Sequence, residues 1–280
     1  MCCENGIPGG TISSPDAAGE MIAKECGYTP TALTNEVSKG TTQKDRARDV
    51  IEFFKSIIQP ESAAVEIGIG VAGVWLAESG IKTWKYNSSE AKDGYAFKNK
   101  HAPDADTFNY KGKKYYKDQA SMMQFGYGKG VAQWSWSRNF KFRDWYNSSQ
   151  GVKTEGIPTM DENASGITGT SVTTQTAFAW KEMSERTGEF MDVINGIIEH
   201  PAESKDEYII HIINVVDAVL RGFENGDKLK MASKKQIDKY TWSGGYSGSM
   251  KKRVSGALGV GEALKDEYPD ILWYLINEDS

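Results

Sequence analysis

The pattern of apolar positions first indicates a buried helix between Ala63 and Ala77. Apolar residues occupy every side of a helical projection of this segment, and Glu66 is its one ionisable interruption. Such a distribution is typical of a helix enclosed by a core, because a surface helix keeps one polar face. Its glycines lower helix propensity by up to about 1 kcal/mol each, so we expect them to permit close approach of another element. Gly80 is the expected end of the helix.

Apolar periodicity predicts further helices before and after this segment. Residues 43–59 form an amphipathic pattern that ends at Pro60, and we expect this helix to pack against the buried one. The same periodicity predicts helices over 137–146, 174–185, 207–223 and 262–276. Between residues 82 and 119 the chain is polar, and residues 108–116 indicate a hairpin that turns near Gly112. The predicted fold class is therefore mainly α, with a small β-hairpin region.

Composition and charge argue against several classes of protein. With 280 residues, of which 39% are hydrophobic, the chain can bury a large core. Its net charge of −5 argues against a nucleic-acid-binding protein, which would present a basic surface. The three cysteines, at positions 2, 3 and 26, do not form the pattern of a disulfide-stapled domain. No histidine stands at metal-ligand spacing from another histidine or a cysteine, so we expect no metal and no other cofactor.

Glu78 points most clearly to chemistry, because it closes the apolar helix. In the last turn, the negative end of the helix dipole and the loss of hydration both disfavour an ionised carboxylate. Trp75 and Val74 lie three and four positions earlier, on the same face of the helix. An apolar wall beside a carboxyl group is how glycosidases prepare a general acid. The alternative is a glutamate that points into solvent beyond the core.

Two short motifs follow one another along the chain. The first is Glu78-Ser79-Gly80 at the end of a helix of small residues; the second is Gly128-Lys129-Gly130-Val131-Ala132-Gln133-Trp134, followed by Arg138. From about residue 45 to residue 260 the chain resembles the phage tail lysozyme family, which is similar to goose-type lysozymes and soluble lytic transglycosylases. Lys129 stands where that family usually has an aromatic residue. The resemblance implies a lysozyme-like α+β fold and an enzyme, a lysozyme-type glycoside hydrolase.

The implied reaction is cleavage of the β-1,4 bond between N-acetylmuramic acid and N-acetylglucosamine in peptidoglycan, with Glu78 as the general acid. Gln133 is the preferred substrate-orienting residue, because the flanking glycines permit close backbone approach and an amide hydrogen-bonds in two directions; alternatively, it ties a turn together. Gln124, in a segment similar to the Gly-Leu-Met-Gln motif of transglycosylases, competes for this role. Trp134 either lines a sugar groove or caps the core, and Gln175 is a candidate for the groove floor.

A second carboxylate would come from the polar region that contains the hairpin. The candidates are Asp93, Asp104, Asp106 and Asp118. Retaining hydrolases hold their two carboxyl groups about 5 Å apart, whereas inverting ones leave several ångströms more for a water molecule. Without a second carboxylate, as in lytic transglycosylases, the N-acetyl group of the sugar assists and an anhydro product forms. A further alternative is a catalytically inactive structural or wall-binding protein.

The expected organisation is an N-terminal arm over 1–42, a catalytic domain over 43–260, and a C-terminal helix over 261–280 that packs on this domain. The arm lies outside the family resemblance, and it either anchors the protein to a larger particle or packs on its own domain. The first ten residues lack the features of a secretory signal, and the apolar stretches are shorter than the roughly 20 residues of a membrane span. The resemblance implies a protein made in the host cytoplasm without a signal peptide. It would associate with the virion and other phage tail proteins and act on peptidoglycan at the bacterial cell wall.

Overall fold

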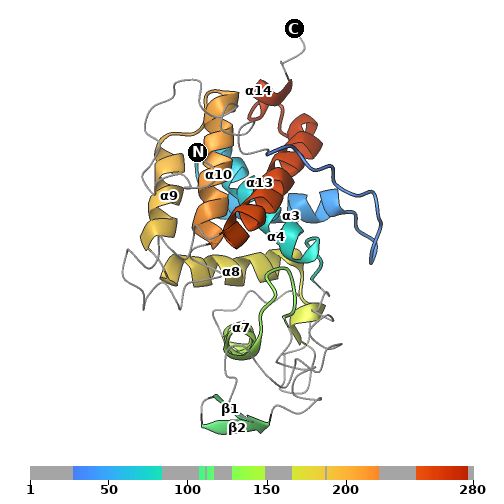
Figure 1. Cartoon of the computed structure of the whole chain (residues 1–280), viewed down its shortest axis with the longest axis vertical. Helices are drawn as coiled ribbons and strands as arrows, with labels where there is room; N and C mark the ends of the chain where they lie inside the picture. The colour runs from blue at the N-terminus through green and yellow to red at the C-terminus, as the bar shows by residue number, and fades with distance from the viewer. Residues whose placement is uncertain are drawn as a thin grey trace. The chain divides into compact units, whose positions relative to one another are not determined.

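The computed structural model describes residues 28–83, 107–110, 112–116, 128–148, 166–186, 188–220 and 244–276. These residues are mainly helical, as predicted (Figure 1). The chain divides into two compact units: unit 1 comprises residues 1–77 and 179–280, and unit 2 comprises residues 78–178. Both boundaries fall inside helices, in α4 (Glu61–Ser79) and in α8 (Val172–Arg186).

Helix α3 (Gln43–Ile57) confirms the amphipathic helix expected before Pro60. It begins with a capping box, in which the Thr42 hydroxyl accepts a hydrogen bond from the Asp45 amide at 3.1 Å and the Asp45 carboxylate accepts one from the Thr42 amide at 2.8 Å. These bonds satisfy backbone donors that the first helical turn leaves without partners. Helix α4 follows and ends at Gly80, whose φ of +68° is the left-handed conformation that commonly terminates helices.

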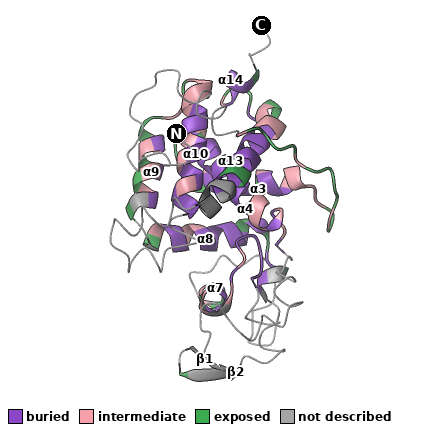
Figure 2. Cartoon of the chain, viewed as in Figure 1, coloured by how far each residue is buried: buried purple, intermediate pink, exposed green. Residues whose placement is uncertain are grey.

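The glycines of α4 lie where other helices approach closely, as the sequence predicts. A Cβ atom at Gly68 would lie 2.9 Å from the Ile51 Cα of α3. One at Gly73 would lie 2.6 Å from the Ala257 Cα of α13 (Gly244–Leu264). One at Gly70 would overlap Val215 of α10 (Lys205–Val219). Figure 2 shows the resulting core, with buried residues along α10 and α13.

Unit 1 is completed by α9 (Gly188–Glu199), which packs against α10, and by the second part of α8. Trp180 of α8 bridges two elements of this unit, with its ring 5.6 Å from that of Phe54 in α3 and 5.6 Å from that of Phe190 in α9. By length and composition α4 could also cross a membrane, but 78% of the qualifying window is buried inside the protein. Most of this helix is therefore enclosed by the core.

The single helix predicted over 262–276 is wrong. Helix α13 ends at Leu264, a 3-10 helix, η5, covers Lys265–Glu267, and the short α14 covers Trp273–Ile276. Pro269 explains the interruption, because proline disfavours the helical conformation of the residue before it and lacks the amide hydrogen needed to continue the helix. Tyr268 accordingly has φ −126° and ψ 53°.

The described part of the expected N-terminal arm is largely exposed, but it touches its own unit at Thr31. The Thr31 amide donates to the Ser255 carbonyl of α13 at 2.8 Å. A Cβ atom at Gly259, one turn further along α13, would overlap the backbone of Thr31. Residues 1–27 lie outside the described part of the chain.

Unit 2 contains two short strands, β1 (Thr107–Tyr110) and β2 (Lys113–Tyr116), in the segment where the sequence indicates a hairpin. They pair antiparallel, with Thr107 opposite Tyr116 and Tyr110 opposite Lys113. Gly112 lies between them with a φ of +78°. The unit also contains α7 (Trp136–Asn147), which confirms the helix predicted over 137–146, and the 3-10 helix η3 (Gly166–Gly169).

Candidate functional site

Glu78 lies in the last turn of α4, and its side chain is partly buried. Ser79 is buried behind it, and Gly80 and Ile81 both have positive φ, at +68° and +56°. A positive φ is uncommon for a β-branched residue and costs on the order of 1–3 kcal/mol. Ile81 is fully buried, so packing of its side chain offsets this strain. The chain therefore turns sharply just after the candidate acid.

The second motif forms a compact loop over Gly128–Trp134, here called the glycine loop. Lys129 and Trp134 close it as an isolated antiparallel bridge, with N···O distances of 3.0 Å and 2.9 Å. Within the loop, Gly130 and Gln133 have φ of +76° and +53°. The Gln133 side-chain amide donates to the Gly130 carbonyl at 2.7 Å. This contact corresponds to the structural alternative for Gln133, in which the amide ties a turn together.

Gln175 connects the glycine loop to the segment that follows Glu78. Its Oε1 accepts a hydrogen bond from the Val131 amide at 2.8 Å. Its Nε2 donates to the Thr83 carbonyl at 3.3 Å, and also to the Ile167 carbonyl at 2.7 Å and the Thr170 hydroxyl at 3.1 Å. The side chain is fully buried. The groove-floor role expected for Gln175 is therefore corrected, because protein groups saturate its amide and no part of the side chain reaches solvent.

Gly130 is required for this connection. A Cβ atom at that position would overlap Gln175 Oε1 and would lie 3.0 Å from the Ile167 side chain. The glycine thus permits close approach, as expected, but the group that approaches is Gln175 rather than a ligand.

Trp134 occupies the second of its two predicted positions, the core. It is fully buried, and its ring centroid lies 5.2 Å from that of Phe142 and 5.7 Å from that of Phe178. Phe178 in turn lies 5.3 Å from Trp145. In this structure Trp134 does not line a groove. It anchors the glycine loop to the aromatic core of unit 2.

Lys129 is a buried cation that sequence reasoning singled out only as a departure from the family pattern. It is 4% exposed, and burial, with a smaller contribution from the charge of Arg143, lowers its pKa to about 8. Arg143 is also buried, and its Nε donates to Asn139 Oδ1 at 2.9 Å. Two basic side chains are thus buried near one another, Lys129 in the glycine loop and Arg143 in α7.

The remaining predicted site residues cannot be placed. Gln124 and the four carboxylate candidates, Asp93, Asp104, Asp106 and Asp118, all lie outside the described residues. Among the residues that the structure does describe, no three His, Cys, Asp or Glu side chains are grouped so as to hold a metal ion.

Unit 1 contains a buried polar pair. The fully buried Glu66 carboxylate contacts His211 Nδ1 at 2.6 Å and accepts a hydrogen bond from the Ala202 amide at 2.9 Å. Glu66 is the charge that interrupts the apolar pattern of α4, and His211 is its partner on α10. The sequence contained no signal that paired His211 with Glu66.

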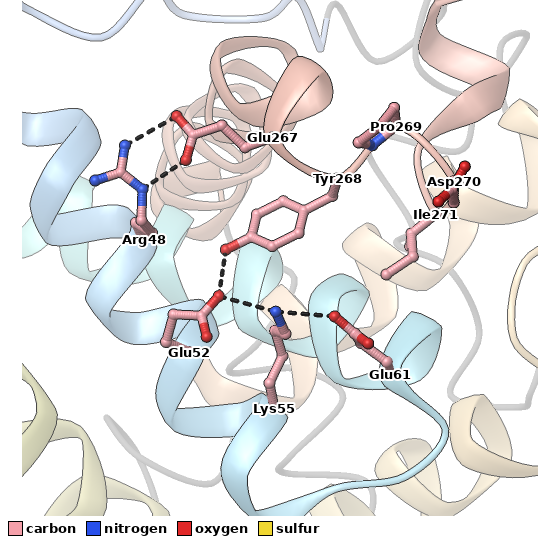
Figure 3. A pocket seen from close by; sticks show the side chains of 9 residues that line it. All are labelled: Arg48, Glu52, Lys55, Glu61, Glu267, Tyr268, Pro269, Asp270 and Ile271. Atoms are coloured by element: carbon pink, nitrogen blue, oxygen red, sulfur yellow. Dashed lines mark hydrogen bonds and ion pairs between the residues drawn. The ribbon is translucent and has the colours of Figure 1, made fainter.

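Unit 1 also carries a surface pocket of about 350 Å³ between α3, the start of α4 and the segment around Pro269 (Figure 3). Arg48 and Glu267 pair across it, and Lys55 lies between Glu52 and Glu61. The Tyr268 hydroxyl donates to Glu52 at 2.8 Å. These groups bind one another across the pocket and fasten η5 to α3. None of the predicted site residues lines this pocket.

Comparison with protein-family models, with curated proteins and with solved structures gives no match for this chain.

Proposed function

We propose that the protein is a peptidoglycan-degrading glycosidase of the lysozyme type, with Glu78 as its general acid. The observation that carries this proposal is the connection made by Gln175, which joins Thr83, shortly after Glu78, to Val131 in the glycine loop. About fifty residues of sequence separate the two motifs, yet one buried side chain links the backbone beside the first to the backbone of the second. This is the arrangement expected if both motifs contribute to one site.

In the proposed reaction, Glu78 protonates the glycosidic oxygen as the sugar develops oxocarbenium character. A carboxyl group at the end of a buried helix is suited to this role, because the packed helix behind it limits the positions that the side chain can reach. The partly buried state of Glu78 leaves it accessible to a substrate. The paired strands β1 and β2 are proposed to belong to a β-hairpin that forms part of one wall of the saccharide groove, within a lysozyme-like α+β fold.

The setting implied by the sequence resemblance completes the proposal. A lytic protein carried by a phage particle would open the bacterial wall locally, and residues 1–42 would contact other tail or virion proteins. Probing purified virions with an antibody against this chain tests the setting. Detection only in the host lysate, never in particles, would instead indicate an enzyme released at lysis.

The decisive experiment is mass spectrometry of the soluble products after incubation with peptidoglycan. The parent chain, Glu78→Gln and the control Glu199→Gln would be compared, because Glu199 is an exposed glutamate at the end of another helix. We expect reducing muropeptides from the parent and the control, and none from a folded Glu78→Gln variant. Equal product from Glu78→Gln, with an unchanged circular dichroism spectrum, would remove Glu78 from the mechanism.

Two other outcomes separate the alternatives. Products that end in 1,6-anhydro-muramic acid would identify a lytic transglycosylase acting on the same bond with the same acid. Absence of products from the parent, together with retained binding of glycan in a fluorescent saccharide titration, would identify a wall-binding protein without turnover.

A further inference from the structure

The side chain of Gln175 makes more specific contacts than a packing role requires. Four protein groups surround its amide: the Val131 amide donates to Oε1, and Nε2 faces three acceptors, which are the Ile167 and Thr83 carbonyls and the Thr170 hydroxyl. The Thr170 hydroxyl accepts from Nε2 and donates to the Ile167 carbonyl at 2.8 Å, so it is oriented by the same cluster. Only an uncharged amide in one orientation satisfies this set.

The backbone on each side of this amide contains one non-glycine residue with positive φ, Ile81 or Gln133, a conformation that residues with a Cβ atom rarely adopt. On one side, Gly80 and Ile81 have positive φ between Glu78 and Thr83. On the other, Gly130 and Gln133 have positive φ around Val131. Such conformations persist when surrounding contacts determine them. The hydrogen bonds of Gln175 are contacts of that kind, because one ends on Val131, which follows Gly130, and the other ends on Thr83, two residues after Ile81.

We infer that Gln175 is a positioning residue for the proposed reaction: it fixes the backbone after Glu78 relative to the glycine loop and thereby sets where the acid stands. This inference rests on the proposed function. It replaces the direct substrate contact predicted for Gln175 by an effect transmitted through Thr83 and Val131. Loss of this alignment affects the chemical step more than substrate binding, since misplacement of a reacting group by about 1 Å can cost about 100-fold in rate.

The test uses Gln175→Met, which keeps the length and apolar volume of the side chain but removes every hydrogen bond of its amide. Thr176→Val is the matched control. Thr176 is a fully buried neighbour on α8, and its hydroxyl has no hydrogen-bond partner among the described residues. Both variants and the parent would be assayed on a soluble peptidoglycan oligosaccharide across pH, alongside hydrogen exchange of the Val131 amide.

For Gln175→Met we expect faster exchange at Val131, a fall in kcat of about 10–100-fold, a KM within about threefold of the parent, and a displaced alkaline limb of the pH profile, the limb that a general acid sets. Thr176→Val should match the parent in all four readouts. A folded Gln175→Met protein with fast exchange at Val131 but parental kcat and pH profile would overturn the inference and leave Gln175 with a structural role.

A more conservative variant covers the case in which Gln175→Met does not fold. Thr170→Val removes one of the acceptors of Nε2 and should lower kcat by a smaller factor in the same direction; parental kcat for this variant would count against the inference. Glu78→Gln decides the proposed function independently. If Glu78→Gln is inactive while Gln175→Met behaves like the parent, the proposed function stands and the inference fails. If the parent itself has no activity, both fail.

Discussion

The carboxylate of Glu66 and the imidazole of His211 lie 2.6 Å apart, one on α4 and the other on α10. Glu66 is fully buried, whereas the His211 side chain retains 17% of its exposure. This hydrogen bond ties the centre of α4 to α10. The charge of Glu66 also contributes, after burial, to raising the pKa of the buried hydroxyls of Tyr208 and Tyr274. One buried charge thus influences several elements of unit 1.

Removing only one partner of the Glu66–His211 pair should lower the stability of the protein strongly. His211→Leu leaves the buried carboxylate with the Ala202 amide as its one remaining partner among the described residues, and we expect the free energy of unfolding to fall by about 3–5 kcal/mol. The double variant Glu66→Leu with His211→Leu should lose much less, because it removes the charge as well. Urea unfolding of the parent, both single variants and the double variant measures the coupling; purely additive losses would contradict it.

Glycine-to-alanine changes should have opposite effects on stability at Gly73, where α4 contacts α13, and at Gly196, where the helix surface is open. At Gly73 the new Cβ would lie 2.6 Å from the Ala257 backbone, so the helices must separate, and we expect a loss of about 1–3 kcal/mol. At Gly196, in α9, nothing lies within 4 Å of the new atom. There alanine should stabilise the protein by up to about 1 kcal/mol, because it favours the helix. Thermal unfolding of the two variants decides, and equal midpoints would contradict the packing argument.

The ion pair between Arg48 and Glu267 predicts that the stability of the protein falls at low pH. Hydrogen bonds from Arg48, and then from Lys44, lower the pKa of Glu267 to about 2. Because the folded pKa lies below the unfolded value of about 4.3, the stabilisation is complete above pH 4.3 and is lost as pH falls towards 2. The pair is partly solvent-exposed, so the loss should stay within about 1 kcal/mol. Glu267→Gln should remove this part of the acid limb in unfolding experiments between pH 2 and 6. An identical limb in the variant would assign the acid sensitivity to other carboxylates.

The buried Lys129 predicts that the free energy of unfolding rises with pH above pH 8. Burial lowers its pKa to about 8, below the unfolded value of about 10.4, so the protonated lysine destabilises the folded state most below pH 8. This cost declines as pH rises from 8 to about 10. Lys129→Met should therefore raise the free energy of unfolding at neutral pH by up to about 3 kcal/mol, at about 1.4 kcal/mol per pKa unit, and should abolish the rise above pH 8. A less stable variant at pH 7 would show that the charge is required in the fold.

The helical part of the fold was predictable where local pattern and packing agree. Periodicity located α3, α4 and α7, and the glycines of α4 indicated close helix contacts before their partners were known. The predicted helix over 262–276 failed because its apolar spacing continues across Pro269, and the backbone chemistry of proline prevails over side-chain periodicity.

The site was predictable only at the level of motifs. Glu78 and the glycine loop could be identified from their order along the chain. The roles of Gln175 and Trp134 could not, since both depend on what surrounds them after folding: a glutamine that contacts substrate and one that braces two loops look alike in sequence. The pairing of Glu66 with His211 was hidden for the same reason, because residues 145 positions apart are brought together only by the tertiary fold.

The attachment of Thr31 to α13 has a mechanical consequence. If the N-terminal segment fastens the protein to a larger assembly, a pulling force transmitted along the chain meets the hydrogen bond from Thr31 to Ser255 before it reaches α3. The load then enters unit 1 through α13, the helix that also touches α4 at Gly73. Part of the tension would then pass to α13 before it acts on the first turn of α3.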